Sequence, residues 1–303
     1  KEAQELAQIE DNELPVSETK IADLVKFFVA NDLYKITDDE TNYLLQCVET
    51  CRKFEGVLGE TYVSFSESKD KKDLLIHLVT INLQKAFRFL LEKNKAFVLM
   101  SGTIHSSEVL REVFGIKDFK IVEAETTNQG EIRKVRTGYE ADFKYANLIG
   151  AGKRIHYLKA LNKSVEKAKR PTLVHVNAFS DLPTEDEKNS NELNSLISQE
   201  ELKEIQKHDS ENALVGDFKN GEINVLFSTK CNRGVDFPGE ICNSVVITKY
   251  PYPDSNSLFW KILRKYKADI FWEFYKDKAR RELLQRVYRS VRSSTDYVEV
   301  LSP

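Results

Sequence analysis

Three side chains near the C-terminus have the types and the spacing to bind a phosphate group. Gln285, Arg289 and Arg292 lie three or four positions apart in a predicted helix, so they share one helical face. Arginine keeps its charge at physiological pH, and its planar guanidinium binds phosphate oxygens in pairs. The motif predicts an arginine finger directed at a nucleotide γ-phosphate. A solvated basic helix is the alternative that the motif alone leaves open.

A second group of candidate residues follows the short apolar stretch Val225–Phe227. Gly234 permits the close approach of a ligand, and Asp236 is suited to bind a ribose hydroxyl, an arginine or a metal-bound water. An ordinary surface loop is the alternative for this segment. Two hydroxyls, a lysine and an arginine can hold a phosphodiester backbone without reading the bases, and they come from Ser228, Thr229, Lys230 and Arg233.

Three further polar segments lie in or after predicted strands. The turn Ser101–Thr103 exposes backbone N–H groups and two hydroxyls that can bind an anion or a carboxylate, or simply cap the next helix. His175 is interpreted as a packed strand residue and not as a catalyst. The segment Lys249–Asp254 presents tyrosines between two prolines, which fit base stacking and core packing equally well.

The composition limits the class of protein. The 303 residues are 41% hydrophobic and 31% charged, with a net charge of −3, which predicts a folded core and excludes a uniformly basic nucleic-acid binder. A local basic surface is predicted on the helices from Lys261 to Arg292. There is no signal peptide pattern and no apolar run long enough to span a bilayer. We therefore expect a soluble protein without a membrane partner, in the cytoplasm or, in a eukaryote, the nucleus.

The cysteines do not predict a metal site or a disulfide framework. Cys47 and Cys51 share a face of a predicted helix, but no further Cys or His pair completes a metal site. The other two, Cys231 and Cys242, are scattered, as expected for a chain in a reducing compartment. We expect buried structural thiols and no metal bound by this chain.

Short apolar stretches that alternate with helical patterns predict an α/β fold with a mostly parallel sheet from about residue 60. The preceding region is predicted to be an α-helical annex, in which Thr37 and Glu40 form a capping box. The expected domains are 1–58, 59–125 and 126–303. The predicted strands are Thr61–Phe65, Leu74–Val79, Phe97–Met100, Phe119–Val122, Thr172–Val176, Val225–Phe227, Val245–Ile247 and Tyr297–Leu301.

Helices are predicted between these strands, and the polar stretch Pro183–Ser210 is predicted to be an insertion with short helices. The stretch Ser257–Val291 is predicted to form two helices. The other predicted helices are Leu83–Leu91, Ser107–Phe114, Arg154–Lys167 and Glu211–Phe218.

The chain lacks a recognisable phosphate cradle. Gly150–Arg154 looks like a phosphate-binding loop, but it lacks the first glycine at the required distance and the Ser or Thr after the lysine. An arginine finger without a cradle needs a nucleotide that is held by another segment or another domain.

Five motifs in order resemble the C-terminal half of an XPD/DinG-type superfamily 2 DNA helicase, over about residues 60–303. The resemblance implies a RecA-like (P-loop NTPase-like) second motor domain. It also implies that 59–125 is a remnant of the first motor domain with motif III, and that 1–58 belongs to the arch region or to the first motor domain. The motifs are Ser101-Gly102-Thr103, Ala178-Phe179, Arg233-Gly234-Val235-Asp236-Phe237, Tyr250-Pro251-Tyr252-Pro253, and Gln285 with Arg289 and Arg292.

The resemblance also implies roles for these residues. In the family, motif III, which corresponds to Ser101–Thr103, couples ATP hydrolysis to DNA movement. Motif V, here Ser228–Asp236, contacts the DNA backbone and the nucleotide, and motif VI, here Gln285, Arg289 and Arg292, contacts the γ-phosphate. Such helicases use ATP and Mg²⁺ and often carry an iron–sulfur cluster. The Walker A lysine, the Walker B acids and the cluster cysteines are expected to precede residue 1.

Three positions depart from the family pattern. Tyr288 replaces a glycine in motif VI, Arg233 replaces an acidic residue in motif V, and Ala178 replaces a serine in motif IV. The tyrosine is the departure that bears most on ATP hydrolysis, because its ring would enter the nucleotide cleft. The two motif VI arginines are retained, which favours activity.

The function expected from these residues is that of an ATP-dependent 5′–3′ DNA helicase, a hydrolase that acts in DNA repair or replication. Its expected partners are single-stranded DNA, the N-terminal helicase half and repair proteins, and the isolated chain is expected not to hydrolyse ATP. A non-catalytic DNA-binding or scaffolding module derived from such a helicase is the alternative. An unrelated Rossmann-like enzyme would need a Gly-rich turn after its first strand, which the sequence lacks.

Overall fold

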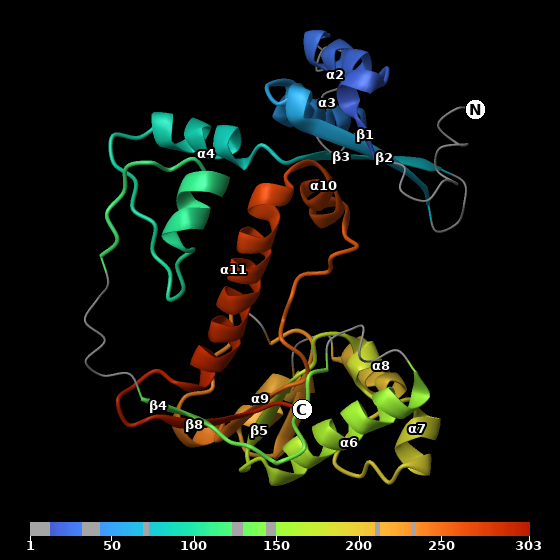
Figure 1. Cartoon of the computed structure of the whole chain (residues 1–303), viewed down its shortest axis with the longest axis vertical. Helices are drawn as coiled ribbons and strands as arrows, with labels where there is room; N and C mark the ends of the chain where they lie inside the picture. Colours follow the sequence, from blue (N-terminus) through green and yellow to red (C-terminus); the bar gives the residue numbers. More distant parts are fainter. Residues whose placement is uncertain are drawn as a thin grey trace. The chain divides into compact units, whose positions relative to one another are not determined.

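The computed structural model describes residues 13–31, 43–68, 73–122, 130–143, 150–209, 213–231 and 234–303 (Figure 1). Contacts divide the chain into two compact units. The first comprises Lys1–Met100, His105–Phe119 and Tyr252–Asp277, and the second comprises Ser101–Ile104, Lys120–Pro251 and Lys278–Pro303. The predicted boundaries at residues 58 and 125 stay a prediction, since these units group residues by contact across distant stretches of sequence.

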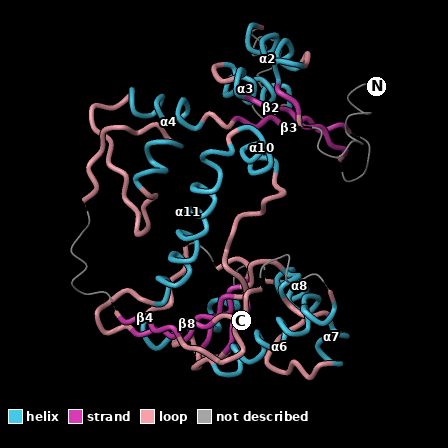
Figure 2. The backbone as a smooth tube through the Cα atoms, viewed as in Figure 1, coloured by secondary structure: helices cyan, strands magenta, loops and turns pink. Residues whose placement is uncertain are grey.

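The second unit is built on a five-stranded sheet in which every neighbouring pair of strands is parallel (Figure 2). All residues of the inner strands β5 and β7 are buried, as expected for parallel strands covered on both faces. The predicted α/β fold with a mostly parallel sheet is thus confirmed. The strand order is β4-β8-β7-β5-β6, with bounds Glu131–Lys134, Tyr297–Leu301, Ser244–Ile247, Thr172–His175 and Val225–Ser228.

Both faces of this sheet carry a hydrophobic core. In β5, Val174 packs in a core with Tyr157 of α6 (Ala151–Lys167), whereas Leu173 packs in another core with Phe218 of α9 (Ala213–Lys219). Successive side chains of a strand point to opposite faces, so one apolar run supplies both cores. Polar residues follow the carboxyl ends of the strands: Asn177 after β5, Thr229 after β6 and Thr248 after β7.

The polar stretch Pro183–Ser210 forms two short helices, α7 (Glu185–Ser190) and α8 (Gln199–His208), which confirms the prediction of short helices there. Each begins with a capping box, in which a hydroxyl accepts a backbone N–H and a glutamate three residues on accepts another. The insertion is anchored, because three of its leucines are no more than 2% exposed within the α6 core: Leu193, Leu196 and Leu202.

The first unit has an antiparallel sheet of three strands in the order β1-β2-β3. Val16, Val63 and Phe65 form a small core on this sheet. A larger core gathers aromatic residues of the last two helices against a π-helical turn, η4. The strands are Leu14–Pro15, Thr61–Glu67 and Leu74–Thr80; the helical segments are α2 Ile21–Ala30, α3 Tyr43–Glu55, α4 Leu83–Glu92, η4 Val109–Val113, α10 Leu258–Tyr266 and the first part of α11 Ala268–Val287.

The prediction that β2 and β3 join the parallel sheet is wrong. They pair with each other in antiparallel register, with Tyr62 opposite Val79. The connection from Glu67 to Leu74 is much shorter than the dozen or so residues that a parallel crossover needs. The N-terminal annex is also not purely helical, because β1 pairs with β2.

Two predicted strands are absent from the described residues. Phe97–Met100 has no ladder partner there, and its side chains are exposed, Met100 by 90%. Phe119–Val122 is also not a strand over its described length. Conversely, the edge strand β4 was missed because all four of its residues are exposed and only one is apolar, which gives no burial pattern. The predicted capping box of Thr37 and Glu40 lies outside the described residues.

The prediction of two helices in Ser257–Val291 is confirmed by α10 and α11. However, α11 ends at Val287, and a single 3-10 turn, η7 (Tyr288–Ser290), follows it. The backbone N–H groups of Arg292 and Ser293 donate to Asp296 at 2.5 and 2.7 Å, which closes the chain into a turn after η7.

Candidate nucleotide-binding and nucleic-acid-binding site

Two of the predicted segments meet at Asp236. Arg289 Nη1 donates to Asp236 Oδ1 at 3.2 Å and to the carbonyl of Val235 at 2.9 Å, and Arg292 Nη2 also donates to Asp236 Oδ1. The Phe237 N–H donates to the Arg289 carbonyl at 2.8 Å. The hydrogen bond from Arg292 and the charges of both arginines lower the pKa of Asp236. The carboxylate is therefore ionised and holds both arginines beside the loop after β6.

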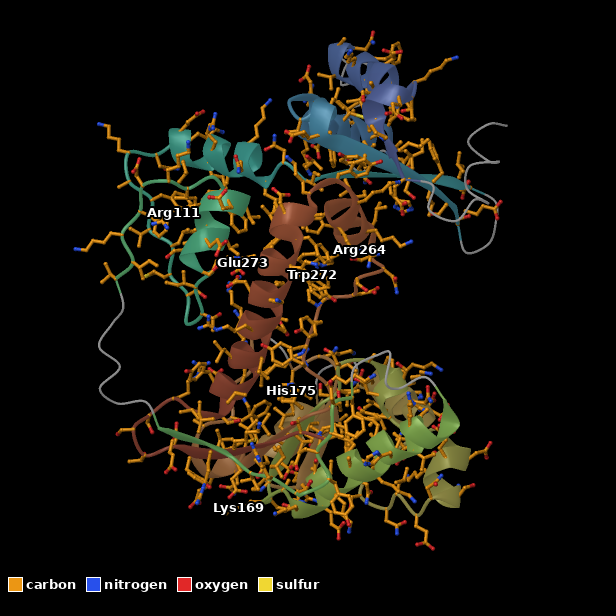
Figure 3. The ribbon with its side chains drawn as sticks, viewed as in Figure 1. Arg111, Lys169, His175, Arg264, Trp272 and Glu273 are labelled. Atoms are coloured by element: carbon orange, nitrogen blue, oxygen red, sulfur yellow. The ribbon has the colours of Figure 1, made fainter. Side chains whose placement is uncertain are left out.

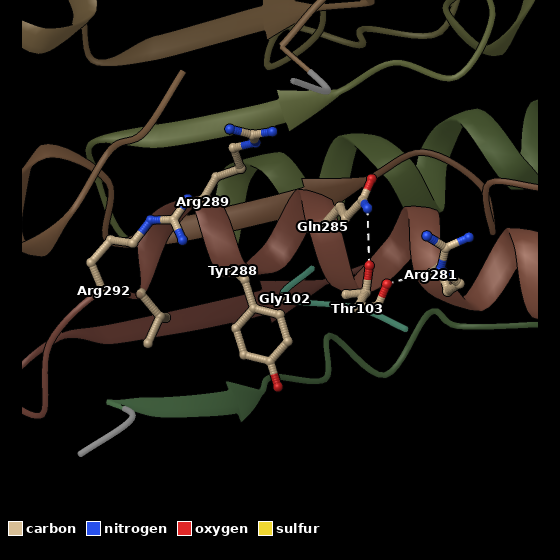
Figure 4. A pocket seen from close by; sticks show the side chains of 8 residues that line it. Gly102, Thr103, Arg281, Gln285, Tyr288, Arg289 and Arg292 are labelled. Atoms are coloured by element: carbon tan, nitrogen blue, oxygen red, sulfur yellow. Dashed lines mark hydrogen bonds between the residues drawn. The ribbon is translucent and has the colours of Figure 1, made fainter. Parts of the chain in front are cut away.

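The third member of the predicted motif, Gln285, has a different partner. Its Nε2 donates to Thr103 Oγ1 at 2.9 Å, and Arg281 Nε donates to the Thr103 carbonyl at 3.0 Å (Figure 4). Within the turn, Ser101 Oγ donates to the same carbonyl at 2.9 Å and accepts the Thr103 N–H at 3.2 Å. The turn Ser101–Thr103 is thereby fixed on the last part of α11.

A cavity of about 620 Å³ lies between these groups. Its lining brings the turn after Met100 together with the end of α11 and η7, and it includes all three residues of the predicted arginine motif. Tyr288, which replaces the glycine of the family pattern, also lines the cavity. The side chains in Figure 4 present three guanidinium groups at this cavity, a concentration of hydrogen-bond donors and positive charge that suits phosphate oxygens. The lining residues are Gly102, Thr103, Arg281, Gln285, Tyr288, Arg289, Val291 and Arg292.

A polar network that the sequence did not predict is centred on a buried arginine. Arg286 is 4% exposed; its Nε donates to Glu282 at 3.2 Å, and its Nη2 donates to Asn177 Oδ1 at 3.1 Å. The Asn177 N–H donates to Thr248 Oγ1 at 3.1 Å. The network joins α11 to the carboxyl ends of β5 and β7. The spacing of Glu282 and Arg286, four residues apart on a helix, was the available signal.

The same network continues to a second cation. Thr248 Oγ1 donates to Asp181 Oδ2 at 2.9 Å, and Lys249 Nζ lies 2.5 Å from Asp181 Oδ1. Asp181 is 1% exposed, and these partners supply the hydrogen bond and the cation that a buried carboxyl group needs. Lys249 also lies 5.4 Å from the centre of the Tyr157 ring, a distance that permits a cation–π contact.

His175 is fully buried at the end of β5, and neither of its ring nitrogens has a hydrogen-bond partner among the residues that the structure describes. Burial and the nearby charges of Arg286 and Arg289 lower its pKa to about 3. The imidazole is therefore neutral at physiological pH. This agrees with its interpretation as a packed strand residue, and we assign it no catalytic role.

Three of the residues predicted to hold a phosphodiester backbone lie at the end of β6: Ser228 is its last residue, and Thr229 and Lys230 follow it. Ser228 Oγ accepts hydrogen bonds from the N–H groups of Lys230 and Cys231 at 3.0 and 3.1 Å, which stabilise the turn after β6. Thr229 Oγ1 donates to Gln206 Oε1 of α8 at 2.8 Å. Gly234 has φ +78°, which favours glycine. Arg233 lies outside the described residues.

Two further sequence expectations concern metals and membranes. Among the described residues, no group of three or more His, Cys, Asp or Glu side chains is arranged to hold a metal ion. Cys51, Cys231 and Cys242 are buried, and burial raises the pKa of each thiol. No helix in the described part of the chain is long and apolar enough to cross a membrane.

Comparison with known proteins finds a family match and similar solved structures. Residues 161–302 match the family described as Helicase C-terminal domain. A solved XPD structure described as apo has 18% identity and a TM-score of 0.56, over 90% of this chain and 56% of the other. A second, described as an XPD helicase, has 16% identity and a TM-score of 0.56, over 99% of this chain and 59% of the other. No curated protein matches the chain.

At these identities the structural matches define the fold, and the chain spans somewhat more than half the length of the two XPD structures. The family match covers four of the five strands of the parallel sheet, β5 to β8, together with Asp236 and the arginines. The predicted resemblance to the C-terminal half of an XPD-type superfamily 2 helicase is thus confirmed: residues 161–302 match the helicase C-terminal domain family, and the chain has the fold of the XPD structures.

Proposed function

We propose that the chain works as the C-terminal part of an ATP-dependent DNA helicase that moves 5′ to 3′ along single-stranded DNA in repair or replication. The observation that carries the proposal is the cavity where Arg289, Arg292 and Gln285 meet the turn Ser101–Thr103. The family match and the fold support the same conclusion.

The arginines supply positive charge to the phosphates of ATP. In the proposed reaction, Arg289 and Arg292 exchange Asp236 for oxygens of the γ-phosphate and stabilise the charge that develops there during transfer. Arg292 and Asp236 are both about half exposed, so their ion pair can exchange partners at small cost. The Val235 carbonyl keeps its hydrogen bond from Arg289 Nη1, and the Phe237 N–H holds the Arg289 backbone in place.

The proposed coupling to DNA runs through two loops. Gln285 lines the cavity and donates a hydrogen bond to Thr103. A shift of this helix end on nucleotide binding would therefore move the motif III turn. Asp236 links the same arginines to the loop that begins with Ser228 and Thr229. With Ser101, Lys230 and Arg233, these residues are proposed to contact the DNA backbone.

The remaining requirements are also proposals. The donor set of the cavity fits the anionic phosphates of ATP, but Asp236, the carboxylate beside it, is already shared by two arginines. We therefore assign the Mg²⁺ ligands and the phosphate cradle to an N-terminal helicase half that acts as a partner. An iron–sulfur cluster, if the complete protein has one, is assigned to the same half, and repair proteins and a cytoplasmic or nuclear location follow from the proposed role. Bound Mg²⁺ would neutralise phosphate charge.

The test is ATP hydrolysis by the complete protein with Arg289→Ala. An arginine finger contributes about 10³–10⁵ in rate, so the rate of DNA-stimulated ATP hydrolysis should fall by up to a factor of this size. Arg280→Ala is the matched control, because Arg280 is an exposed arginine of the same helix that does not line the cavity. Full activity of Arg289→Ala would refute the role of this residue. We expect the isolated chain to bind single-stranded DNA weakly, in a salt-sensitive way, without hydrolysing ATP.

A non-catalytic DNA-binding or scaffolding module remains the second candidate, and the position of Tyr288 favours it. The phenol ring lines the cavity where the family has a glycine. If the ring blocks the nucleotide, Tyr288→Gly should raise ATP hydrolysis by the complete protein from an undetectable level. If the ring only lines the site, the parent protein should already hydrolyse ATP, and this candidate fails.

A further inference from the structure

The first unit carries a column of stacked aromatic rings that ends at the surface. Tyr252 stacks on Tyr275 with ring centres 5.2 Å apart and an angle of 11°, and Tyr275 stacks on Phe271 at 5.2 Å and 17°. Tyr275 and Phe271 are 9% and 2% exposed, whereas Tyr252 is 45% exposed. The buried rings thus support an exposed one.

The position of the exposed ring is fixed by the chain around it. The Tyr275 hydroxyl donates to the Pro253 carbonyl at 2.7 Å, which ties the loop after β7 to α11. Proline at this position restricts the backbone next to Tyr252. A ring held in this way loses little conformational entropy when it binds a planar ligand.

A tryptophan adds a second exposed aromatic surface beside the column. Trp272 is 60% exposed and packs edge-on against Tyr275 at 6.2 Å and 84°, and against Phe271 at 5.1 Å and 75° (Figure 3). The other tryptophan, Trp260, is 8% exposed within the core. An exposed indole supported by other aromatic rings is a feature of binding surfaces more than of solvated helix faces.

Charge near the column favours an anionic ligand with planar groups. Arg264 acts electrostatically on Tyr275, and Arg264, Lys265 and Lys276 are all exposed. Two carboxylates of α11 are engaged elsewhere: Glu273 accepts from Ser106, and Asp277 accepts the Ser106 N–H. The acidic residues that remain nearby are Asp254, which acts on Tyr275, and Asp269, one turn before Trp272.

We propose that Tyr252 and Trp272 form a base-stacking platform for single-stranded DNA, with Arg264 and Lys276 contributing to backbone contact. Every base has a π-face, so such a platform binds without a strong sequence preference. Its residues belong to the first unit and include none that line the arginine cavity and none of the predicted motif V or motif VI residues. Its use during translocation rests on the proposed function, but the binding itself needs no nucleotide.

The test compares two oligonucleotides of equal length and charge, an oligothymidylate and its abasic counterpart, by fluorescence anisotropy with the 303-residue chain. Stacking by one base contributes about 5- to 150-fold in affinity, so Trp272→Ala and Tyr252→Ala should each weaken oligothymidylate binding within that range. Binding of the abasic strand should change less than about twofold, because stacking needs a base. Tyr139→Ala is the control, since Tyr139 is 50% exposed and lies in the second unit.

Tryptophan fluorescence gives an independent readout. Oligothymidylate should quench the emission of the parent chain, and Trp272→Phe should lose most of this quenching while it keeps part of the affinity, because Trp260 is buried. Thermal unfolding checks that the variants are folded. Equal losses on both strands, no loss on either, or the same loss in Tyr139→Ala would each overturn the platform. Full ATP hydrolysis by Arg289→Ala would refute the nucleotide role and leave this result unchanged.

Discussion

Two arginines one turn apart, Arg286 and Arg289, belong to regions with opposite properties. Arg286 is buried, and its guanidinium is shared between Glu282 of α11 and Asn177 after β5. Arg289 points into the cavity, where it shares an exposed carboxylate with Arg292. The first arrangement can hold the fold together, and the second can change partners. Proximity in sequence therefore does not identify which arginine could serve a ligand.

The difference follows from solvation. Removing a guanidinium from water costs several kcal/mol, and the cost is recovered only while its partners stay in place. An ion pair at the surface contributes about 0–1 kcal/mol, because water and salt screen it. The buried network is therefore expected to resist change, whereas the pairs at Asp236 are expected to yield to a phosphate.

Arg286→Ala should have the largest effect on stability. It leaves the carboxylate of Glu282 and the amide of Asn177 without their buried partner, a type of change that costs about 3–5 kcal/mol. Urea unfolding should show a loss of that order in the free energy of unfolding. Arg292→Ala, at a half-exposed side chain, should cost less than about 1 kcal/mol. Equal losses for the two variants would remove the distinction between the regions.

His175 should make stability depend on pH. Its pKa is lowered to about 3 in the folded chain from an ordinary value of about 6.5. Between these values the unfolded chain binds the proton and the folded chain does not, so stability falls as pH falls. At about 1.4 kcal/mol per pH unit, the free energy of unfolding should drop by about 2 kcal/mol from pH 7 to pH 5.

A comparison of two histidine variants isolates this effect. His175→Phe should flatten the dependence between pH 7 and pH 5, whatever its effect on stability at pH 7. His208→Gln is the control, because the His208 side chain is 72% exposed and its replacement should leave the dependence unchanged. A parent chain with constant stability over this range would show that the folded state accepts a proton at His175.

Gln285→Ala should have a smaller effect, on the contact between the cavity and the motif III turn. The hydrogen bond from Gln285 Nε2 to Thr103 Oγ1 is 2.9 Å long and partly buried, and such a bond contributes about 1 kcal/mol. A double-mutant cycle with Thr103→Val, measured by urea unfolding, should give a coupling energy of this size. No coupling would show that the turn is held by Arg281 alone.

The parallel sheet was predictable, because β5, β6, β7 and β8 are short apolar runs separated by helical patterns. The pairing of β2 with β3 was predictable from the length of the loop between them, because a loop this short joins antiparallel strands and cannot form a parallel crossover. β4 left no signal, since an exposed edge strand lacks an apolar pattern. Local periodicity therefore predicted the elements that are buried and failed where burial is absent.

The arginine site was predictable in part. The sequence placed its three residues on one helical face, but in the structure they meet at a cavity for a different reason. Gln285, Arg289 and Arg292 line one cavity, but α11 ends at Val287 and the last two extend from η7 and the turn after it. Helical spacing alone could not assign Gln285 to Thr103 and the arginines to Asp236, because these contacts bridge distant segments. Arg286 was overlooked because a buried arginine and a solvated one look alike in sequence.

Asp236→Asn should have the smallest effect on stability and the clearest dependence on salt. The hydrogen bond from Arg292 and the charges of both arginines lower the pKa of Asp236, so its contribution is present above the ordinary carboxyl pKa and is lost as pH falls below it. Since the side chain is 47% exposed, screening should keep this contribution to about a few tenths of a kcal/mol. Urea unfolding at low and high salt should therefore differ more for the parent chain than for the variant. A loss as large as that of Arg286→Ala would instead make Asp236 part of the fold, and its arginines could then not exchange it for a phosphate.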